Sequence, residues 1–188
     1  MSDRGKREKS VFAIVMYTFD LSLIAPAAPK ENNFYFRLNQ MLRERDAEKM
    51  KRCAAYMHYL LYGLEALQPF ACRPDAHLWR GVSREGREMV LKNYIRGRTV
   101  HWSGFSSASP SREVAAGFAG PGGVLLRLDL LHDGSRARDI RALSAIPSEQ
   151  EVLLLPNFAL FVTNVLQPLD GLDTIELVEM SGEHSHFF

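Results

Sequence analysis

The sequence predicts an α+β fold in which helices come first and mostly antiparallel strands follow. Between residues 50 and 67, apolar residues recur at steps of three and four, as they do along the buried face of a helix. From Leu78 onward, short apolar runs are separated by glycine, proline and serine, a pattern typical of strands and turns. A helical segment followed by a run of strands is an α+β arrangement.

The composition indicates one globular domain. With 188 residues, the chain can form a core that buries about 70% of its unfolded surface. The formal net charge of +1 provides no general attraction for nucleic acid or an anionic membrane, so we expect neither partner. No apolar run approaches the ~20 residues that a membrane helix needs. We therefore expect no membrane span, and we also expect a monomer.

The N-terminus only superficially resembles a signal peptide. A basic stretch, residues 4–9, precedes the apolar run 11–17, but that run is short and ends in Thr18-Phe19-Asp20. We predict a soluble protein with no clear signal peptide. The sequence does not fix its location, and the candidates are the cytoplasm and secretion by a non-classical route. The predicted divisions are a flexible basic tail (1–10), a single domain (11–182) with a helical lobe (11–70) and a β core (77–182), and a flexible C-terminal tail (183–188).

The two cysteines predict no metal site. Cys53 and Cys72 form no CxxC pair, and neither lies near a histidine at metal-ligand spacing. One disulfide between them and two thiols are both compatible with the sequence. The helical pattern around Cys53 and the lack of other cysteines favour two thiols. His184 and His186 belong to a terminus that we expect to fray rather than to bind metal.

Capping residues place the helices. Asn32 or Asn33 can begin a helix that continues through Leu42, and Asp46 can begin a second that ends before Pro69. Two further helices interrupt the strands, one from Ser83 to Gly97 and one from Ser111 to Phe118. The predicted strands are 77–82, 99–106, 123–131, 150–155, 158–166 and 173–180.

Arg80 is predicted on the apolar face of the first strand. Alternate side chains of a strand share a face, so Leu78, Arg80 and Val82 should point one way and Trp79 the other. A guanidinium there is costly unless an anion pairs with it. That anion is either a structural carboxylate or a ligand. Gly81 favours a ligand, because glycine lets a ligand approach the backbone closely.

Serines gather at residues 106–111, directly before a predicted helix. Turn and capping roles suit Ser109 or Ser111 and leave Ser107 without a structural task. No GxSxG elbow surrounds Ser107, so a nucleophile is not indicated. We interpret Ser107 as a hydrogen-bonding residue that positions other groups.

Glu149 and Glu151 form an acid pair that leads into the apolar run 152–155. If both were in a strand, they would share one face about 7 Å apart, and each charge would raise the proton affinity of the other. Glu149 alone fits an ordinary solvated turn. Glu151 opens a buried strand, where a carboxylate suits the stabilisation of a cationic sugar-like transition state.

The order and spacing of these segments resemble the arginine-specific mono-ADP-ribosyltransferase family, the R-S-E class. The similarity covers nearly the whole chain, and the ordered set of segments is specific although no single one is decisive. It extends over residues 16–18, 34–43, 78–82 and 146–153. The resemblance implies two packed β-sheets, a preceding helical lobe and a cleft for NAD, the co-substrate, with no metal.

The resemblance also implies roles for individual residues. Arg80 would bind the NAD phosphates and the nicotinamide-side ribose, and the Gly81 backbone would hold the carboxamide. Ser107 would position the ribose and the catalytic acid, Glu151, which would stabilise the oxocarbenium ion. Glu149 would orient and help deprotonate the guanidinium of an acceptor protein. Phe118 is the candidate for stacking on nicotinamide, although an apolar helix residue is often plain core.

Other features concern specificity and the alternatives. In this class Glu-x-Glu resembles the arginine-modifying pattern and Gln-x-Glu goes with other acceptors, so Glu149 favours arginine. Ala108 replaces the family's middle threonine, and Trp79 stands where tyrosine is common. The alternatives are an NAD glycohydrolase and a non-catalytic nucleotide- or protein-binding module. The poly-ADP-ribosyl branch is disfavoured, since it resembles a His-Tyr-Glu pattern.

Overall fold

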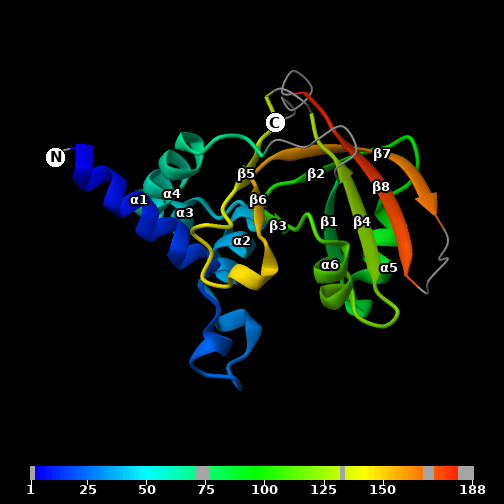
Figure 1. The fold of residues 1–188 in the computed structure, drawn as a ribbon, viewed down its shortest axis with the longest axis horizontal. Helices are drawn as coiled ribbons and strands as arrows, with labels where there is room; N and C mark the ends of the chain where they lie inside the picture. The colour runs from blue at the N-terminus through cyan, green and yellow to red at the C-terminus, as the bar shows by residue number, and fades with distance from the viewer. Residues whose placement is uncertain (1–2, 71–76, 132–133, 167–171, 182–188) are drawn as a thin grey trace.

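Six α-helices and two β-sheets make up the part of the chain that the computed structural model describes, which is residues 3–70, 77–131, 134–166 and 172–181. The helices before residue 70 form a lobe beside the sheets, and the other two helices lie against the larger sheet (Figure 1). This arrangement confirms the predicted α+β fold, with an N-terminal helical lobe on a mostly antiparallel two-sheet core.

Close packing of two helices organises the helical lobe. A Cβ on Gly63 would lie 2.9 Å from the Cβ of Ser10, so glycine at this position lets the first and fourth helices approach. Ala13 and Ile14 are buried in the same contact region. The lobe consists of α1 (Asp3–Thr18), α2 (Phe34–Glu44), α3 (Ala47–Arg52) and α4 (Ala54–Ala66), with short 3-10 helices η1 (Leu21–Leu23) and η2 (Lys30–Asn32) before α2.

The prediction of a flexible tail over residues 1–10 is wrong for the residues that the structure describes, because α1 begins at Asp3. An acid in the first turn favours a helix N-terminus, and Arg4 and Glu8 pair at 3.0 Å one turn apart. Ser10 is buried against α4. The charged residues at the start of α1 resemble a solvated tail in the sequence, although the later turns of this helix pack into the lobe.

The predicted helix over residues 46–67 is divided at Cys53. Asp46 caps α3 as expected, by accepting a hydrogen bond from the Lys49 amide at 3.0 Å. Cys53 has φ −90° and ψ 1°, so it ends α3 and precedes α4. Its thiol is free. Cys72 and the predicted C-terminal tail, 183–188, lie outside the described residues.

The β core consists of a five-stranded and a three-stranded sheet. The larger sheet has the order β1 (Leu78–Val82), β4 (Val124–Asp129), β8 (Asp173–Glu179), β7 (Phe158–Leu166), β2 (Thr99–Trp102). The smaller has the order β3 (Ser106–Ala108), β6 (Val152–Leu154), β5 (Ala137–Asp139). Strands β4 and β8 pair in parallel and the other neighbours are antiparallel. The helices α5 (Arg84–Asn93) and α6 (Arg112–Ala119) follow β1 and β3 along the chain.

Several predicted elements differ from the structure in their bounds. The strand expected over 99–106 is two strands, since β2 ends at Trp102 and β3 begins at Ser106 in the other sheet. The helix expected up to Gly97 ends at Asn93. Strand β5 has three residues and was not predicted, because so short a segment carries no measurable periodicity.

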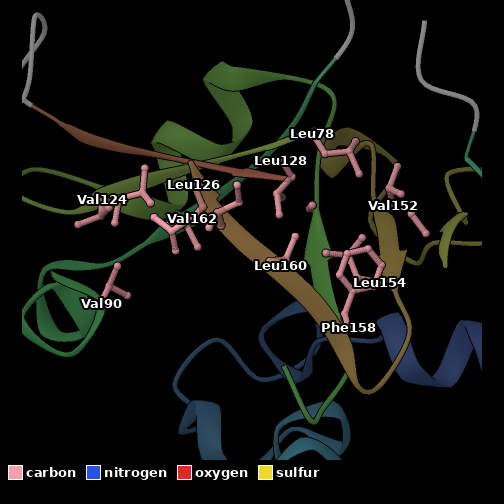
Figure 2. Close-up of a cluster of buried hydrophobic side chains, with 14 residues drawn as sticks. Leu78, Val90, Val124, Leu126, Leu128, Val152, Leu154, Phe158, Leu160 and Val162 are labelled. Carbon is pink, nitrogen blue, oxygen red and sulfur yellow. The ribbon is translucent and has the colours of Figure 1, made fainter. Parts of the chain in front are cut away.

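The smaller sheet packs against the larger sheet on one face and against the helical lobe on the other. Val152 and Leu154 of β6 join the core between the sheets, together with Leu126, Phe158 and other side chains shown in Figure 2. Leu153, which points to the opposite face of β6, is buried with residues of α1, α2 and α4. Strand β6 is therefore covered on both faces, which explains its continuous apolar run.

Candidate active site

A cavity of about 430 Å³ lies where the helical lobe meets strands β1 and β3 and helix α6. All six residues singled out in the sequence line it, although they come from four separate segments of the chain. They are Arg80, Gly81, Ser107, Phe118, Glu149 and Glu151.

Backbone pairing between the two sheets brings Arg80 next to Ser107. The amide of Trp79 donates to the carbonyl of Ser109 at 2.7 Å, and the amide of Ser109 donates back at 2.8 Å. One residue along β1, Arg80 Nη1 donates to the carbonyl oxygen of Ser107 at 2.6 Å. Leu78 and Val82 join the core between the sheets whereas Trp79 packs toward α6, so the predicted division of faces is confirmed.

An aromatic side chain lies beside the Arg80 guanidinium. Its central carbon lies 5.8 Å from the ring centre of Trp102, within the range of a cation–π interaction. The Trp102 Nε1–H donates to the Tyr94 hydroxyl at 2.6 Å, which fixes the ring. Burial lowers the pKa of Arg80 from its ordinary value, yet an arginine stays protonated. Because the guanidinium bonds to a carbonyl rather than a carboxylate, its charge is available to an anionic ligand.

Glu151 lines the cavity and is buried, with 6% of the residue exposed. Its Oε1 accepts a hydrogen bond from Ser107 Oγ at 2.5 Å, and its Oε2 accepts one from Ser144 Oγ at 3.3 Å. Burial raises the pKa of Glu151, while the two serine hydrogen bonds and the charge of Arg80 act in the opposite direction. Ser107 therefore contacts the acid directly, and no capping bond occupies its hydroxyl.

Glu149 lies at the end of a short 3-10 helix, η3 (Pro147–Glu149), and is half-buried. The strand geometry considered for the acid pair is wrong, because Gln150 is left-handed, with φ 49° and ψ 48°, and β6 begins only at Val152. Burial, together with the charges of Glu151 and Asp20, raises the pKa of Glu149 to about 6. The two acids thus occupy different environments within one cavity.

The last turn of α1 holds the segment that carries Glu149. Thr18 Oγ1 accepts a hydrogen bond from the Ala145 amide at 2.9 Å. Ser144 Oγ accepts one from the Ile146 amide at 3.2 Å. The first bond connects the helical lobe to the loop before η3 and the second lies within that loop, so the position of Glu149 depends on α1.

Gly81 and Phe118 lie where β1 meets α6. A Cβ on Gly81 would be 2.0 Å from the Ala115 carbonyl oxygen and 2.6 Å from the Ala119 amide nitrogen. Close packing of α6 therefore requires glycine at position 81, whatever ligand is bound. Phe118 is 57% exposed at the cavity, so the alternative that it is a core residue is wrong.

Further polar side chains of the helical lobe line the cavity, among them Tyr17, Asn39 and Arg43. Asn39 Nδ2 donates to the Tyr17 hydroxyl at 2.9 Å, and burial raises the pKa of this tyrosine. Asn39 and Arg43 are one helical turn apart on α2. The sequence analysis did not single out these residues, although a polar pair at this spacing beside the apolar Leu38 and Met41 could have indicated them.

Among the residues that the structure describes, no group of three or more His, Cys, Asp or Glu side chains is arranged to hold a metal ion. In the same part of the chain, none of the helices has the length and apolar character needed to cross a bilayer.

Comparisons with solved structures show the fold. The Plx2a toxin from Paenibacillus larvae, an ADP-ribosyltransferase, superimposes with a TM-score of 0.69 and 17% identity over 93% of this chain and 87% of that chain. The S. aureus C3stau2 structure with NAD gives a TM-score of 0.66 and 21% identity over 93% and 87%. For the ADP-ribosyltransferase Vis from Vibrio splendidus, in complex with agmatine, the values are 0.55 and 17% over 95% and 75%.

No curated protein sequence matches the chain. A family model described as NAD:arginine ADP-ribosyltransferase, however, matches residues 4–185, nearly the full length. This match agrees with a cavity that combines Arg80, Ser107 and the acid pair. The chain belongs to the NAD:arginine ADP-ribosyltransferase family.

Proposed function

We propose that this protein transfers ADP-ribose from NAD to arginine side chains of proteins and releases nicotinamide. The main observation behind the proposal is that Glu149 and Glu151 line one cavity but differ in burial and in hydrogen bonding. Glu151 is buried and bonded to Ser107, whereas Glu149 is half-buried with a pKa raised to about 6. Acids whose environments differ in this way can divide a reaction between them.

The cavity supplies groups that suit NAD. Arg80 and Arg43 line it, and two guanidinium groups match the charge and geometry of a pyrophosphate. Phe118 provides an exposed aromatic face for nicotinamide, and the Gly81 backbone is accessible for its carboxamide. The S. aureus relative with NAD supports the same use of the fold. Ala108 lacks the hydroxyl of the family's threonine, which weakens NAD binding by about 1 kcal/mol.

In the proposed reaction, the bond between the ribose anomeric carbon and the nicotinamide nitrogen breaks, and its electron pair leaves with nicotinamide. The ribose is left as an oxocarbenium ion, and Glu151 stabilises that positive charge. Ser107 holds the Glu151 carboxylate through its 2.5 Å hydrogen bond. Since the site is buried, this electrostatic stabilisation is stronger than in water.

Glu149 acts on the acceptor. An arginine guanidinium must lose a proton before one of its nitrogens can attack the anomeric carbon. A carboxylate with a pKa of about 6 is ionised at neutral pH and basic enough to help in that transfer. Attack from the face opposite nicotinamide inverts the anomeric carbon, and the proton passes to Glu149. The complex of Vis with agmatine, a guanidinium compound, supports this class of acceptor.

Mass spectrometry of the wild-type protein with NAD and agmatine tests the proposal, with Glu151→Gln as the control. We expect wild type to form an ADP-ribosyl–agmatine adduct and release nicotinamide, and the variant to form neither at a comparable rate. Nicotinamide without adduct would instead make the protein an NAD glycohydrolase. Neither product would indicate a binding module and contradict the proposal.

A further inference from the structure

Asp20 is a third carboxylate at the cavity, and the roles proposed so far do not include it. It follows α1 by two residues and lines the cavity together with Glu149 and Glu151. It comes from the helical lobe, whereas the two glutamates come from the segment before β6.

Three hydrogen bonds hold the Asp20 carboxylate in place. Its Oδ1 accepts from the Ser22 amide at 2.8 Å. Its Oδ2 accepts from the Tyr35 hydroxyl at 3.0 Å and from Asn33 Nδ2 at 3.4 Å. Partial burial raises the pKa of Asp20, but these hydrogen bonds outweigh it and lower the pKa below its ordinary value. Asp20 is therefore a fixed anion at neutral pH.

The cavity lining carries three cations, Arg43, Arg80 and Lys30, and three carboxylates, Asp20, Glu149 and Glu151. Arg80 interacts electrostatically with Arg43 and Glu151, whereas Glu149 interacts with Glu151 and Asp20. The pyrophosphate of NAD is anionic and suits the two arginines. The carboxylates of Glu149 and Asp20 suit a cation instead.

We propose that Asp20 and Glu149 together bind the guanidinium of the acceptor, which is a more specific form of the proposed function and rests on it. A guanidinium carries five N–H donors in a planar fork, so it can bond to two carboxylates at once. A carboxylate has about four acceptor positions, and Asp20 uses three in its own hydrogen bonds. Asp20 thus holds the acceptor while Glu149 takes its proton.

Suitable variants separate a structural role of Asp20 from a role of its charge in binding the acceptor. Asp20 caps η1 through the Ser22 amide, and asparagine caps a helix as well as aspartate does. Asp20→Asn therefore keeps the cap and removes the charge. Asp46 provides a matched control, because it also caps a helix but does not line the cavity. A second variant, Tyr35→Phe, removes the hydroxyl that orients Asp20 and leaves its charge unchanged.

The test measures KM for agmatine, KM for NAD and the rate of NAD cleavage, and an NMR titration gives the Kd of agmatine. For Asp20→Asn we expect KM and Kd for agmatine each to rise about tenfold, because one charge-assisted hydrogen bond is lost. The NAD constants should stay within about twofold. Tyr35→Phe should give a smaller rise, and Asp46→Asn none.

Each other outcome separates the two proposals. If wild type modifies agmatine but Asp20→Asn leaves both agmatine constants unchanged, the role of Asp20 is overturned and the transferase stands. Equal rises for NAD and agmatine would assign Asp20 a structural role. If wild type binds agmatine in an Asp20-dependent way but forms no adduct, the transferase is overturned and the subsite stands. No binding and no adduct would overturn both.

Discussion

Ser107 Oγ donates a hydrogen bond of 2.5 Å to Oε1 of Glu151, so this serine and this acid act as one unit between β3 and β6. The bond favours the ionised carboxylate, which burial alone disfavours. Arg80 adds to the same effect from β1, and its guanidinium donates to the carbonyl of Ser107. Ser107 therefore connects the cation and the acid of the site.

Ser107→Ala should shift the acidic limb of NAD cleavage to higher pH. Without the hydroxyl, burial of Glu151 is opposed by one hydrogen bond fewer, so its pKa rises and the ionised form is lost at a higher pH. At neutral pH we expect kcat/KM to fall about tenfold, the effect of one hydrogen bond to a charged group. A pH–rate profile measures both effects.

The control for this variant is Ser103→Ala, a change of the same size outside the cavity. It should leave the profile unchanged. A Ser107→Ala profile that lost rate equally at every pH, with no displacement of the limb, would argue against a direct effect on Glu151.

Transfer to agmatine should decline below about pH 6. Burial and the charges of Glu151 and Asp20 raise the pKa of Glu149 to about 6, so below this value Glu149 becomes neutral and cannot accept the acceptor's proton. The rate should then fall about tenfold per pH unit. Measuring kcat/KM for agmatine from pH 4.5 to 8 locates the pH at which the rate begins to fall. A fall that began only at the ordinary pKa of a glutamate would be inconsistent with the burial of Glu149.

Gly81→Ala should destabilise the protein. The added Cβ would lie 2.0 Å from the Ala115 carbonyl oxygen, so α6 must move away from β1. Overpacking of this kind costs about 2 kcal/mol, which lowers Tm by roughly 4–8 °C in a chain of this length. Differential scanning calorimetry measures the shift.

Gly117→Ala is the matched control for Gly81→Ala. Gly117 lies in α6, the helix that packs against Gly81, and a Cβ on Gly117 would meet nothing within 4 Å. Alanine is the better helix former, so this variant should gain up to about 1 kcal/mol. Equal Tm values for the two variants would refute the packing role assigned to Gly81.

Phe118→Ala should weaken NAD binding without changing stability. The side chain is 57% exposed, so its loss should alter Tm by no more than about 2 °C. Loss of an aromatic stacking partner is worth about 1 kcal/mol, a roughly fivefold rise in KM for NAD. Phe118→Tyr should restore the wild-type KM, and a KM that Phe118→Ala leaves unchanged would remove Phe118 from the nicotinamide site.

The fold could be predicted where a segment is long enough to show a period. α2, β7 and β8 were placed within a few residues, because each spans several repeats of its own pattern. β5 has three residues and shows no such pattern. α1 was missed because its charged first turns read as a solvated tail, while the contact that orders it, Ser10 against Gly63, joins residues distant in sequence.

The sequence singles out residues that line one cavity, but it does not give their geometry. A strand through both acids would place Glu149 and Glu151 on one face, whereas the left-handed Gln150 puts them in different environments. Asp20 was not singled out, because nothing local to it suggests a cavity. Its place there depends on Tyr35 and Asn33, which hold it from the start of α2.

The division of roles between Glu149 and Glu151 is tested most directly by Glu149→Gln. The variant and wild type are incubated with NAD and agmatine, and adduct and nicotinamide are measured in the same sample. Glu88→Gln, on the exposed surface of α5, serves as the control. Loss of a general base predicts an adduct rate at least about 100-fold lower, while nicotinamide release stays within about fivefold of wild type. An equal loss of both products would contradict the assignment of Glu149 to the acceptor.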